Sequence, residues 1–312
     1  EDVKRGMTDY EVFSAIPVSG TGTSNLDYFN GLPIIVEKDP PDHTRLRRLM
    51  QPAFTPRVVA QVHDSVVALA NQMLDVIEQR GNTIEVVQDM GYPFPTGVIL
   101  GNFLNLPQQD WSIFLTYSNA LALVSELKDG DPKPPEYMHA YNAAFKYCEN
   151  LIEERRRAPK EDLIGTIIAA HDVGGKITTE ELFATLVVLM TGGIGTIGGT
   201  MALAMLRLGR NPDQMDLLRR EPSLINSAIE EVLRIDSLGN FRHRWAARDC
   251  EYEGLKLYKG MPVAICLGAS NYDPVLYPNP EKFDIRRAPQ DLSTFGHGVH
   301  FCIGQGIARP AL

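Results

Sequence analysis

Apolar residues along this chain recur mostly at helical spacing. In residues 56–80, "PRVVAQVHDSVVALANQMLDVIEQR", they return every three or four positions and stop at Gly81. That spacing is typical of an amphipathic helix, and a glycine directly after the last apolar turn favours an end there. Helical patterns also cover four other segments, namely 109–126, 136–156, 161–171 and 222–235.

Strand patterns are short and lie late in the chain. They cover residues 250–258, "CEYEGLKLY", and 261–268, "MPVAICLG", with a Lys-Gly turn predicted between them. Residues 271–290 are rich in Pro, Asn and Asp, which predicts an ordered but irregular loop. The predicted fold class is therefore mainly α with a minor antiparallel β part.

One long segment without charges, residues 182–206, admits two interpretations. Its 25 positions match the length of a membrane span, and Gly195 and Gly199 form a small-xxx-small pair. Thr178 and Glu181, however, form the capping-box pattern of a helix that starts among charged residues. A helix from there to about Arg207 has roughly 30 residues and a length of ~45 Å. We favour the central helix of a large helical domain over a membrane span.

Five glycines interrupt this long helix, and each lowers helix stability by about 1 kcal/mol relative to alanine. They predict that a flat partner approaches the backbone and that the helix is distorted there. Thr196 lies in the middle of the cluster. Its hydroxyl could replace a lost backbone hydrogen bond or face a ligand. The glycines are Gly192, Gly193, Gly195, Gly198 and Gly199.

Composition narrows the class of protein. The chain has 312 residues, a formal net charge of -9 and 44% hydrophobic residues, enough for one large domain or two. The negative charge argues against generic nucleic-acid binding. No secretory signal opens the chain, which favours the cytoplasm. Both ends look cut, so we expect the natural protein to be longer. The cysteines are widely spaced, which favours a reducing compartment over a disulfide framework or a zinc site; they are Cys148, Cys250, Cys266 and Cys302.

Residues 295–304, "FGHGVHFCIG", place three glycines around Cys302. Glycine tolerates positive φ and close approach to a partner, and the following "IGQGIAR" predicts a helix start whose amides would favour a thiolate. Such a sulfur could be a nucleophile with His300 as its base, a soft metal ligand, or an inert buried thiol. The glycines favour the ligand, because they suit a planar macrocycle and cysteine is one of the axial ligands of heme iron.

The same ten residues match the heme-binding signature Phe-Gly-x-Gly-x-His-x-Cys-x-Gly of the cytochrome P-450 family at every fixed position. Other stretches resemble the family in the same order, and together they cover about residue 30 to the end. These are "DPPDHTRLRRLM", "EVLR", "HRWAARDCEYEG" and "NYDPVLYPNPEKFD". The resemblance implies the cytochrome P-450 fold, with a long central I helix over heme b (iron protoporphyrin IX). It also implies a single domain over residues 1–312 that is incomplete at both ends.

The resemblance assigns roles to individual residues. Cys302 becomes the iron ligand, and Phe295 packs against the thiolate side of the ring. Glu231 and Arg234 form the structural pair of the K helix, and Thr196 becomes the catalytic hydroxyl of the I helix. Cationic donors make the burial of two heme propionates tolerable. The cofactor-binding residues so implied are His43, Arg47, Arg244 and His300 at the propionates and Gly192, Gly193 and Gly304 beside the ring.

One motif departs from the family pattern. The oxygen-activating helix of the family reads Ala/Gly-Gly-x-Asp/Glu-Thr, whereas residues 192–196 read Gly-Gly-Ile-Gly-Thr. The threonine is present as Thr196, but Gly195 replaces the acid. This loss puts rapid proton delivery in question, since proton transfer typically contributes ~10²–10⁴-fold to a rate. Water, a substrate group or another side chain would have to substitute.

Three hypotheses follow from the resemblance. The first is a monooxygenase that inserts one oxygen atom from O2 into an apolar organic substrate, with NAD(P)H electrons delivered by a ferredoxin-type partner. The second keeps the thiolate heme but changes the chemistry to peroxygenase or oxidative-coupling activity. The third is a non-enzymatic heme-binding sensor. Neither a nucleic acid nor a membrane is expected as a partner. The residues expected to line the substrate pocket are Val188, Thr191, Gly192, Leu238 and Asn240.

Overall fold

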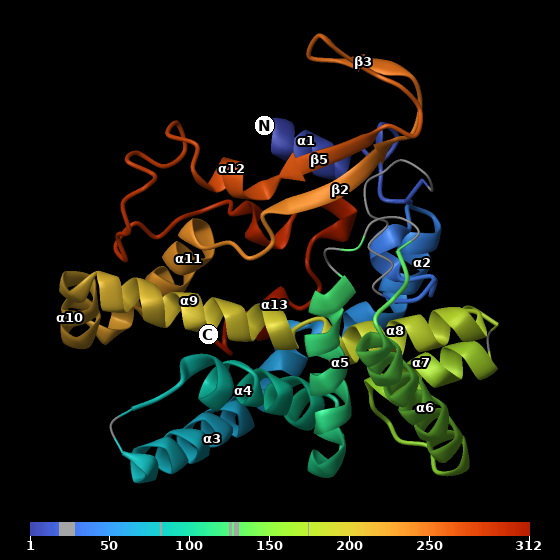
Figure 1. The fold of residues 1–312 in the computed structure, drawn as a ribbon, viewed down its shortest axis with the longest axis horizontal. Helices are drawn as coiled ribbons and strands as arrows, with labels where there is room; N and C mark the ends of the chain where they lie inside the picture. Colours follow the sequence, from blue (N-terminus) through green and yellow to red (C-terminus); the bar gives the residue numbers. More distant parts are fainter. Residues whose placement is uncertain (19–28, 82, 125–126, 128–130, 174) are drawn as a thin grey trace. The chain divides into compact units, whose positions relative to one another are not determined.

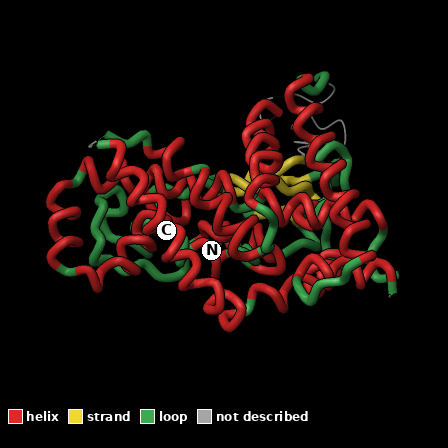
Figure 2. Tube along the Cα trace, turned by 90° about the horizontal axis from the view of Figure 1, so that it is seen from below, coloured by secondary structure: helices red, strands yellow, loops and turns green. Residues whose placement is uncertain are grey.

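The structure is a computed structural model, and helices dominate it while the strands are few and short (Figure 1, Figure 2). This confirms the predicted fold class, mainly α with a minor antiparallel β part. The residues described are 1–18, 29–81, 83–124, 127, 131–173 and 175–312. Internal contacts divide the chain into two compact units. Unit 1 comprises Glu1–Ser14, Thr83–Gly91 and Thr196–Leu312, and unit 2 comprises Ala15–Asn82 and Tyr92–Gly195.

Unit 2 is built from helices, and the predicted long ones are confirmed with small shifts at their ends. The helix over 56–80 stops as predicted at Gly81, whose φ of 118° suits glycine. The α helices are α2 (Asp42–Met50), α3 (Pro56–Arg80), α4 (Pro93–Thr96), α5 (Trp111–Val124), α6 (Pro135–Arg157), α7 (Leu163–Asp172) and α8 (Thr179–Thr191). Short 3-10 turns are η1 (Ile35–Glu37), η2 (Gln51–Phe54) and η5 (Gln108–Asp110), and η4 (Gly97–Phe103) is a π-helix.

The core of unit 2 lies between α5, α6 and α8. Tyr117 of α5 and Tyr137 of α6 are fully buried, with ring centroids 6.0 Å apart. Phe145 of α6 stacks on Phe183 of α8 at 4.3 Å. Fully burying a large apolar side chain contributes roughly 1.5–3 kcal/mol, so these contacts fix the three helices against one another.

The long central helix is present, and its glycines interrupt it. Thr178 and Glu181 form the predicted capping box at the start of α8, with Thr178 Oγ1 accepting from the Glu181 amide at 3.2 Å. α9 (Ile194–Arg210) continues the helix after a turn at Gly192 and Gly193, so the predicted distortion is confirmed. The stretch Thr179–Arg210 is long and apolar enough to span a membrane, but 56% of its most apolar window is buried. That burial supports the core-helix interpretation.

Unit 1 combines short helices with the five strands that the described residues form. Its helices are α1 (Asp2–Thr8), most of α9, α10 (Pro212–Arg220), α11 (Ile225–Ile235), α12 (Leu267–Asn271) and α13 (Gln305–Ala308). Its strands are β1 (Phe13–Ser14), β2 (Phe241–Ala246), β3 (Cys250–Tyr252), β4 (Leu255–Leu257) and β5 (Pro262–Cys266). It also holds the π-helix η3 (Val87–Gly91) and the 3-10 turns η6 (Pro222–Leu224), η7 (Ser293–Phe295) and η8 (Gly298–His300).

The strand pairing differs from the prediction. Residues 250–258 are not one strand, because the chain reverses at Glu253 and Gly254, where φ is 45° and 80°, and β3 pairs with β4. The predicted strand over 261–268 is confirmed in part as β5, because Leu267 and Gly268 already belong to α12, and its partner is β2, which the sequence patterns missed. The larger sheet has the order β1-β2-β5 and is antiparallel throughout.

A second core lies under α11. Val232 and Ile235 of this helix pack with Phe283 and Ile285, which come from the segment 271–290. That segment is irregular, as predicted, and these two buried side chains attach it to the helix. α11 thereby joins the irregular segment to the loop that carries Cys302.

Candidate functional site

Cys302 stands at the end of a tight loop that exposes its side chain. The Cys302 amide donates to the Phe295 carbonyl at 2.9 Å, which closes the loop, and Gly296 and Gly298 have φ of 73° and 69°. A Cβ at Gly298 would press on Thr8 and on the Met7 carbonyl at 3.0–3.2 Å, so only glycine fits there.

Exposure distinguishes this cysteine from an inert thiol. Cys148 is buried in α6, and burial raises the pKa of its thiol to about 12. Cys302 is exposed, although the helix predicted to follow it is only the single turn of α13. An accessible sulfur at a loop end is the arrangement expected of a ligand or nucleophile, not of a packing residue.

The surroundings of the sulfur fit a heme ligand. A Cβ added at Gly304 would meet only the Cys302 sulfur, at 4.0 Å, so the face beside the thiol is open. The rings of Phe295 and Phe301 lie edge to face with centroids 6.5 Å apart and add apolar surface to the loop. A soft sulfur donor beside small and aromatic residues suits the thiolate ligation of iron in a flat macrocycle.

A buried ion pair on α11 supports this loop. Glu231 and Arg234 are both fully buried on α11, and the Arg234 guanidinium donates to both carboxylate oxygens, at 2.7 and 2.9 Å. Arg287 donates a further hydrogen bond to Glu231 at 3.1 Å. Arg234 also donates to the Asn271 carbonyl at 2.9 Å. Each buried charge therefore has partners, as burial requires.

Asn271 carries the connection from the ion pair to the loop. Its side-chain amide donates to Thr294 Oγ1 at 3.0 Å and accepts from the Ser293 amide at 3.0 Å. Thr294 in turn donates to the Leu233 carbonyl of α11 at 2.6 Å. Asn271 is 1% exposed, and the sequence analysis did not single it out because it ends α12, a helix of five residues that is too short to show in the apolar spacing.

Two arginines of unit 1, Arg242 and Arg244, lie on strand β2. Arg244 is buried and donates to the His243 carbonyl at 2.8 Å, whereas Arg242 is water-accessible. Arg242 was not predicted as a site residue; its signal in the sequence is the spacing of two from Arg244. Unit 1 also holds the predicted site residues Thr196, Glu231, Arg234, Leu238, Asn240, Phe295, His300, Cys302 and Gly304.

Unit 2 holds the remaining predicted residues. His43 and Arg47 lie on α2, which a bidentate ion pair from Arg45 to Glu181 attaches to α8 at 2.7 and 2.9 Å. Burial, with a smaller contribution from Arg47, lowers the pKa of His43 to about 4. Val188, Thr191, Gly192 and Gly193 belong to the same unit. The propionate and substrate roles of these residues stay predictions.

The two threonines of the central helix have different surroundings. Thr191 is 4% exposed, and its hydroxyl donates to the Val187 carbonyl of its own helix at 2.8 Å. Thr196 has an exposed side chain, and its carbonyl accepts from the Thr200 hydroxyl at 2.8 Å. Thr196 is thus the better placed of the two to meet a ligand.

Packing explains part of the glycine cluster and corrects the expectation of a flat partner. A Cβ at Gly198 would lie 1.7 Å from the Gly91 carbonyl oxygen, and one at Gly199 would lie 2.7 Å from Leu238 Cδ1. At these two positions the partner is the protein itself. At Gly195 a Cβ would meet only Ser118 Oγ, at 3.8 Å, so sterics do not require glycine there.

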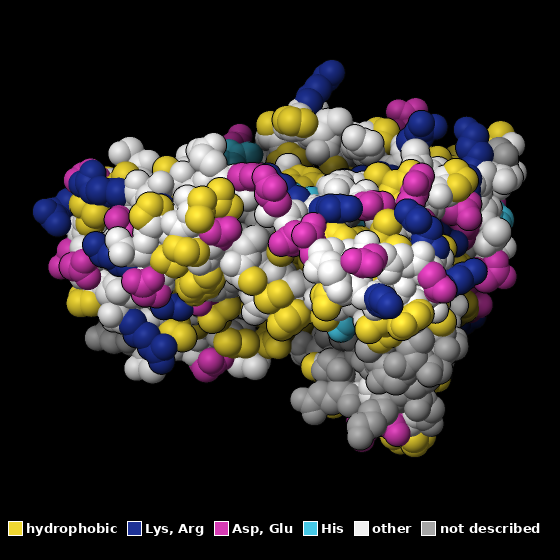
Figure 3. Space-filling model, turned by 90° about the horizontal axis from the view of Figure 1, so that it is seen from above, with side chains coloured by type: hydrophobic (Ala, Val, Ile, Leu, Met, Phe, Trp, Pro, Cys, Tyr) yellow, Lys and Arg dark blue, Asp and Glu magenta, His cyan; other side chains and the backbone are white. Residues whose placement is uncertain are grey.

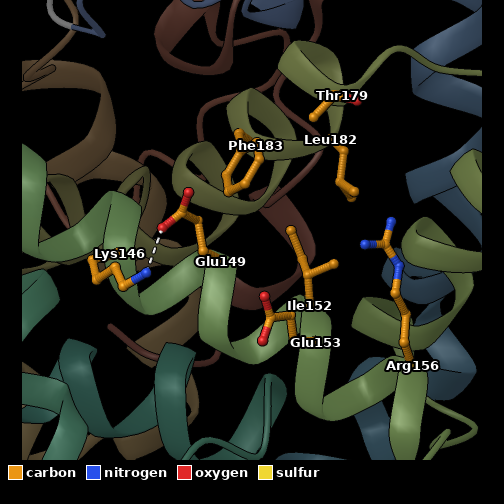
Figure 4. A pocket seen from close by; sticks show the side chains of 8 residues that line it. All are labelled: Lys146, Glu149, Ile152, Glu153, Arg156, Thr179, Leu182 and Phe183. Carbon is orange, nitrogen blue, oxygen red and sulfur yellow. Dashed lines mark hydrogen bonds and ion pairs between the residues drawn. The ribbon is translucent and has the colours of Figure 1, made fainter.

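Unit 2 also has a surface cleft of about 230 Å³ between α6 and α8, and none of the predicted site residues lines it. Figure 4 shows the Lys146–Glu149 ion pair (3.0 Å) at one end and Arg156 at the other. The Arg156 guanidinium is already paired with Asp172, and Phe183 contributes to the core. The cleft is a gap between charged side chains that have partners.

Comparisons with known proteins agree with the loop geometry. The model of the family described as cytochrome P450 matches residues 1–312. The polyketide biosynthesis cytochrome P450 PksS of Bacillus subtilis is 34% identical over 88% of this chain and 66% of its own length. The steroid C26-monooxygenase of Mycobacterium tuberculosis is 32% identical over 89% of this chain and 74% of its own length.

A solved structure shows the same fold. It is that of CxnD, described as the cytochrome P450 enzyme for C-S bond formation in chuangxinmycin biosynthesis. It aligns with 99% of this chain and 75% of its own at a TM-score of 0.86 and 30% identity. The chain spans about two thirds to three quarters of the length of these relatives.

Proposed function

Because this chain belongs to the cytochrome P450 family, we propose that it binds heme b through Cys302 and acts as a monooxygenase. In the proposed reaction one oxygen atom of O2 enters an apolar organic substrate. The other leaves as water, with two protons and with two electrons from NAD(P)H. A ferredoxin-type protein is the proposed electron donor. The observation that carries the proposal is the exposed sulfur of Cys302, on a loop that a buried ion pair supports.

The chain's own residues supply position and charge. Bound heme supplies the iron at which O2 is reduced, and its thiolate ligand favours cleavage of the O–O bond. Arg244 is buried, and its guanidinium suits a heme carboxylate through charge-assisted hydrogen bonds. His300, His43 and Arg47 are proposed to share that role. Phe295, the first residue of the loop, is proposed to limit the access of water to the sulfur.

Thr196 is the proposed catalytic hydroxyl, and it acts without a neighbouring acid. Gly195 offers no carboxylate, so protons must reach Thr196 through water, a substrate group or another side chain. This observation favours a second candidate function on the same thiolate heme, namely peroxide-driven oxidation or oxidative coupling, which needs less proton relay. The description of CxnD as an enzyme of C-S bond formation supports keeping that candidate.

The proposal extends to partners and location. Residues 1–312 are taken as one P450 domain in the cytoplasm, with Val188, Thr191, Gly192, Leu238 and Asn240 lining the substrate pocket. The surface suits an aqueous compartment, because acidic and basic side chains are interspersed among hydrophobic ones on the face in Figure 3. The formal net charge of -9 is consistent with this.

The test compares two ways of driving the intact protein. A panel of steroids, terpenoids and aromatic acids is first screened for a spin-state change of the heme, and the binders are then incubated under two regimes. Product formed with NADPH, ferredoxin and its reductase supports the monooxygenase. Product formed with hydrogen peroxide alone supports the second candidate. Heme-bound protein that binds ligands but forms product under neither regime overturns both and leaves the sensor hypothesis.

A further inference from the structure

We propose that Arg242 binds a carboxylate beside the heme and thereby selects substrates that carry one. This inference rests on the proposed function, because it assumes a heme on Cys302. Arg242 and Arg244 are two residues apart in β2, so their side chains lie on the same face of the sheet. They oppose Ile265 and Val263 of β5, which fixes their register. One face of the strand therefore presents two guanidinium groups in a row.

Neighbouring groups crowd Arg242, and the part of the chain that the structure describes places no counter-ion beside it. Its Nη1 donates to the Phe241 carbonyl at 2.8 Å, and among the described residues no carboxylate lies within 4 Å of its guanidinium. Arg207 and Arg234 of the same unit each contact a carboxylate. Gly239 makes room for this group, because a Cβ there would lie 2.6 Å from Arg242 Nη2.

Electrostatics place the same group near the sulfur. Burial lowers the pKa of Arg242, and the negative charge of Cys302 partly opposes that shift. Protein atoms therefore crowd one side of the guanidinium, which lies within electrostatic reach of the Cys302 sulfur, while the side chain keeps contact with water. A partly desolvated cation is stabilised by an anion that pairs with it, so the position suits a negatively charged ligand. Arginine pairs best with planar carboxylates.

Two carboxylates could fill this position, one from a heme propionate and one from the substrate. Arg244 is 5% exposed, which suits a permanently bound group, whereas Arg242 is accessible to water, which suits a group that exchanges. Leu238, four residues before it, is 44% exposed and offers apolar surface. An aliphatic or aromatic carboxylic acid, with a charged head and an apolar body, is the ligand that this combination fits.

The experiment uses the heme-loaded intact protein and four versions of it: wild type, Arg242→Gln, Arg242→Lys and the control Arg248→Gln. Arg248 is exposed beyond the end of β2 and tests the loss of one positive charge alone. Dodecanoate and its methyl ester are titrated separately while the Soret band is followed. Heme release to excess apomyoglobin is measured in parallel, and the carbon-monoxide spectrum of the wild type checks the heme site independently.

Binding of a substrate carboxylate and binding of a heme propionate predict different results. If Arg242 binds substrate carboxylate, Arg242→Gln weakens dodecanoate binding about 10-fold or more and leaves the ester unchanged, as expected for a charge-assisted hydrogen bond. Arg242→Lys should keep part of the preference for dodecanoate over its methyl ester. If it binds a propionate, Arg242→Gln accelerates heme release about 10-fold or more without altering the acid-to-ester ratio. That second result overturns the proposal, and so does a result in which both readouts of Arg242→Gln match those of Arg248→Gln. Failure of the proposed function would instead appear in the wild-type spectrum.

Discussion

The Cα of Gly198 in α9 packs against the Gly91 carbonyl so closely that a Cβ on Gly198 would lie 1.7 Å from that oxygen. Real Cβ atoms do not approach oxygen to this distance, so any larger residue must push η3 and α9 apart. A position three residues earlier in the same helix, Gly195, has no such neighbour. Packing therefore requires glycine at position 198 but not at position 195.

This contrast predicts opposite effects of the same substitution. Gly198→Ala should lower the free energy of unfolding by about 3 kcal/mol, the upper end of the usual cost of overpacking, because the clash is with backbone and cannot relax by a rotamer change. Gly195→Ala should leave it unchanged or raise it by up to about 1 kcal/mol, because alanine favours the helix. Urea denaturation followed by circular dichroism measures both. Equal losses in the two variants would show that packing is not what distinguishes these positions.

Introducing an acid at position 195 should improve the coupling of NADPH consumption to product formation. Gly195→Asp restores a carboxylate next to Thr196, and the space at this position accepts a side chain. We expect the product formed per NADPH consumed to rise, with a turnover increase on the order of 10-fold or more, which is below the ~10²–10⁴-fold that a positioned proton donor typically contributes. Gly195→Ala is the control for size. If the aspartate variant does no better than the alanine variant, proton delivery is not limited at this position.

Breaking the Glu231–Arg234 pair should loosen the loop that carries Cys302. Glu231→Gln leaves the Arg234 guanidinium buried without its counter-charge, which should lower stability by about 3–5 kcal/mol. Heme should dissociate faster as well, because Asn271 transmits the disturbance to Ser293 and Thr294. The control is Glu221→Gln, whose ion pair with Arg286 is exposed and should contribute less than about 1 kcal/mol. Normal heme retention in Glu231→Gln would contradict the proposed link between this ion pair and the loop that carries Cys302.

The Arg45–Glu181 pair predicts a pH dependence of stability. Hydrogen bonds from Arg45 lower the pKa of Glu181 from its ordinary 4.5 to about 2. The folded protein thus prefers the ionised carboxylate, so its stabilising effect is complete above about pH 4.5 and is lost as the pH falls toward 2. Glu181→Gln should be less stable than wild type by about 2–3 kcal/mol at pH 7, with the gap narrowing below pH 4.5. Thermal unfolding at several pH values measures the gap, with the exposed Glu153→Gln as control. A gap that stays constant down to pH 3 would contradict it.

The sequence predicted those parts of the fold that local patterns determine. α3, α5, α6 and α7 are long and amphipathic, so their apolar spacing identified them. The capping box of Thr178 and Glu181 gave the start of α8. β2 was missed, because its six residues alternate in neither polarity nor size and it becomes a strand by pairing with β1 and β5. The hairpin of β3 and β4 was misread, since the turn at Glu253 and Gly254 is short and flanked by strand-forming residues.

The candidate site divides in the same way. Cys302 and its glycines form a contiguous motif, and Glu231 with Arg234 has a fixed spacing on one helix face, so both could be predicted. Asn271 and Arg242 depend on tertiary contacts with distant segments. The sequence analysis also interpreted Gly198 and Gly199 as leaving room for a ligand. The structure places Gly91 and Leu238 there instead, which no local pattern could indicate.

The central claim, that the Cys302 sulfur is the ligand of a heme iron, has one most direct test. It is the absorption spectrum of the reduced, carbon-monoxide-bound intact protein, recorded for wild type and for Cys302→His. We expect a strongly red-shifted Soret band in wild type, because thiolate ligation produces it, and loss of that shift in Cys302→His. Wild-type protein that takes up heme without the red shift, or a Cys302→His variant that keeps it, would contradict the assignment.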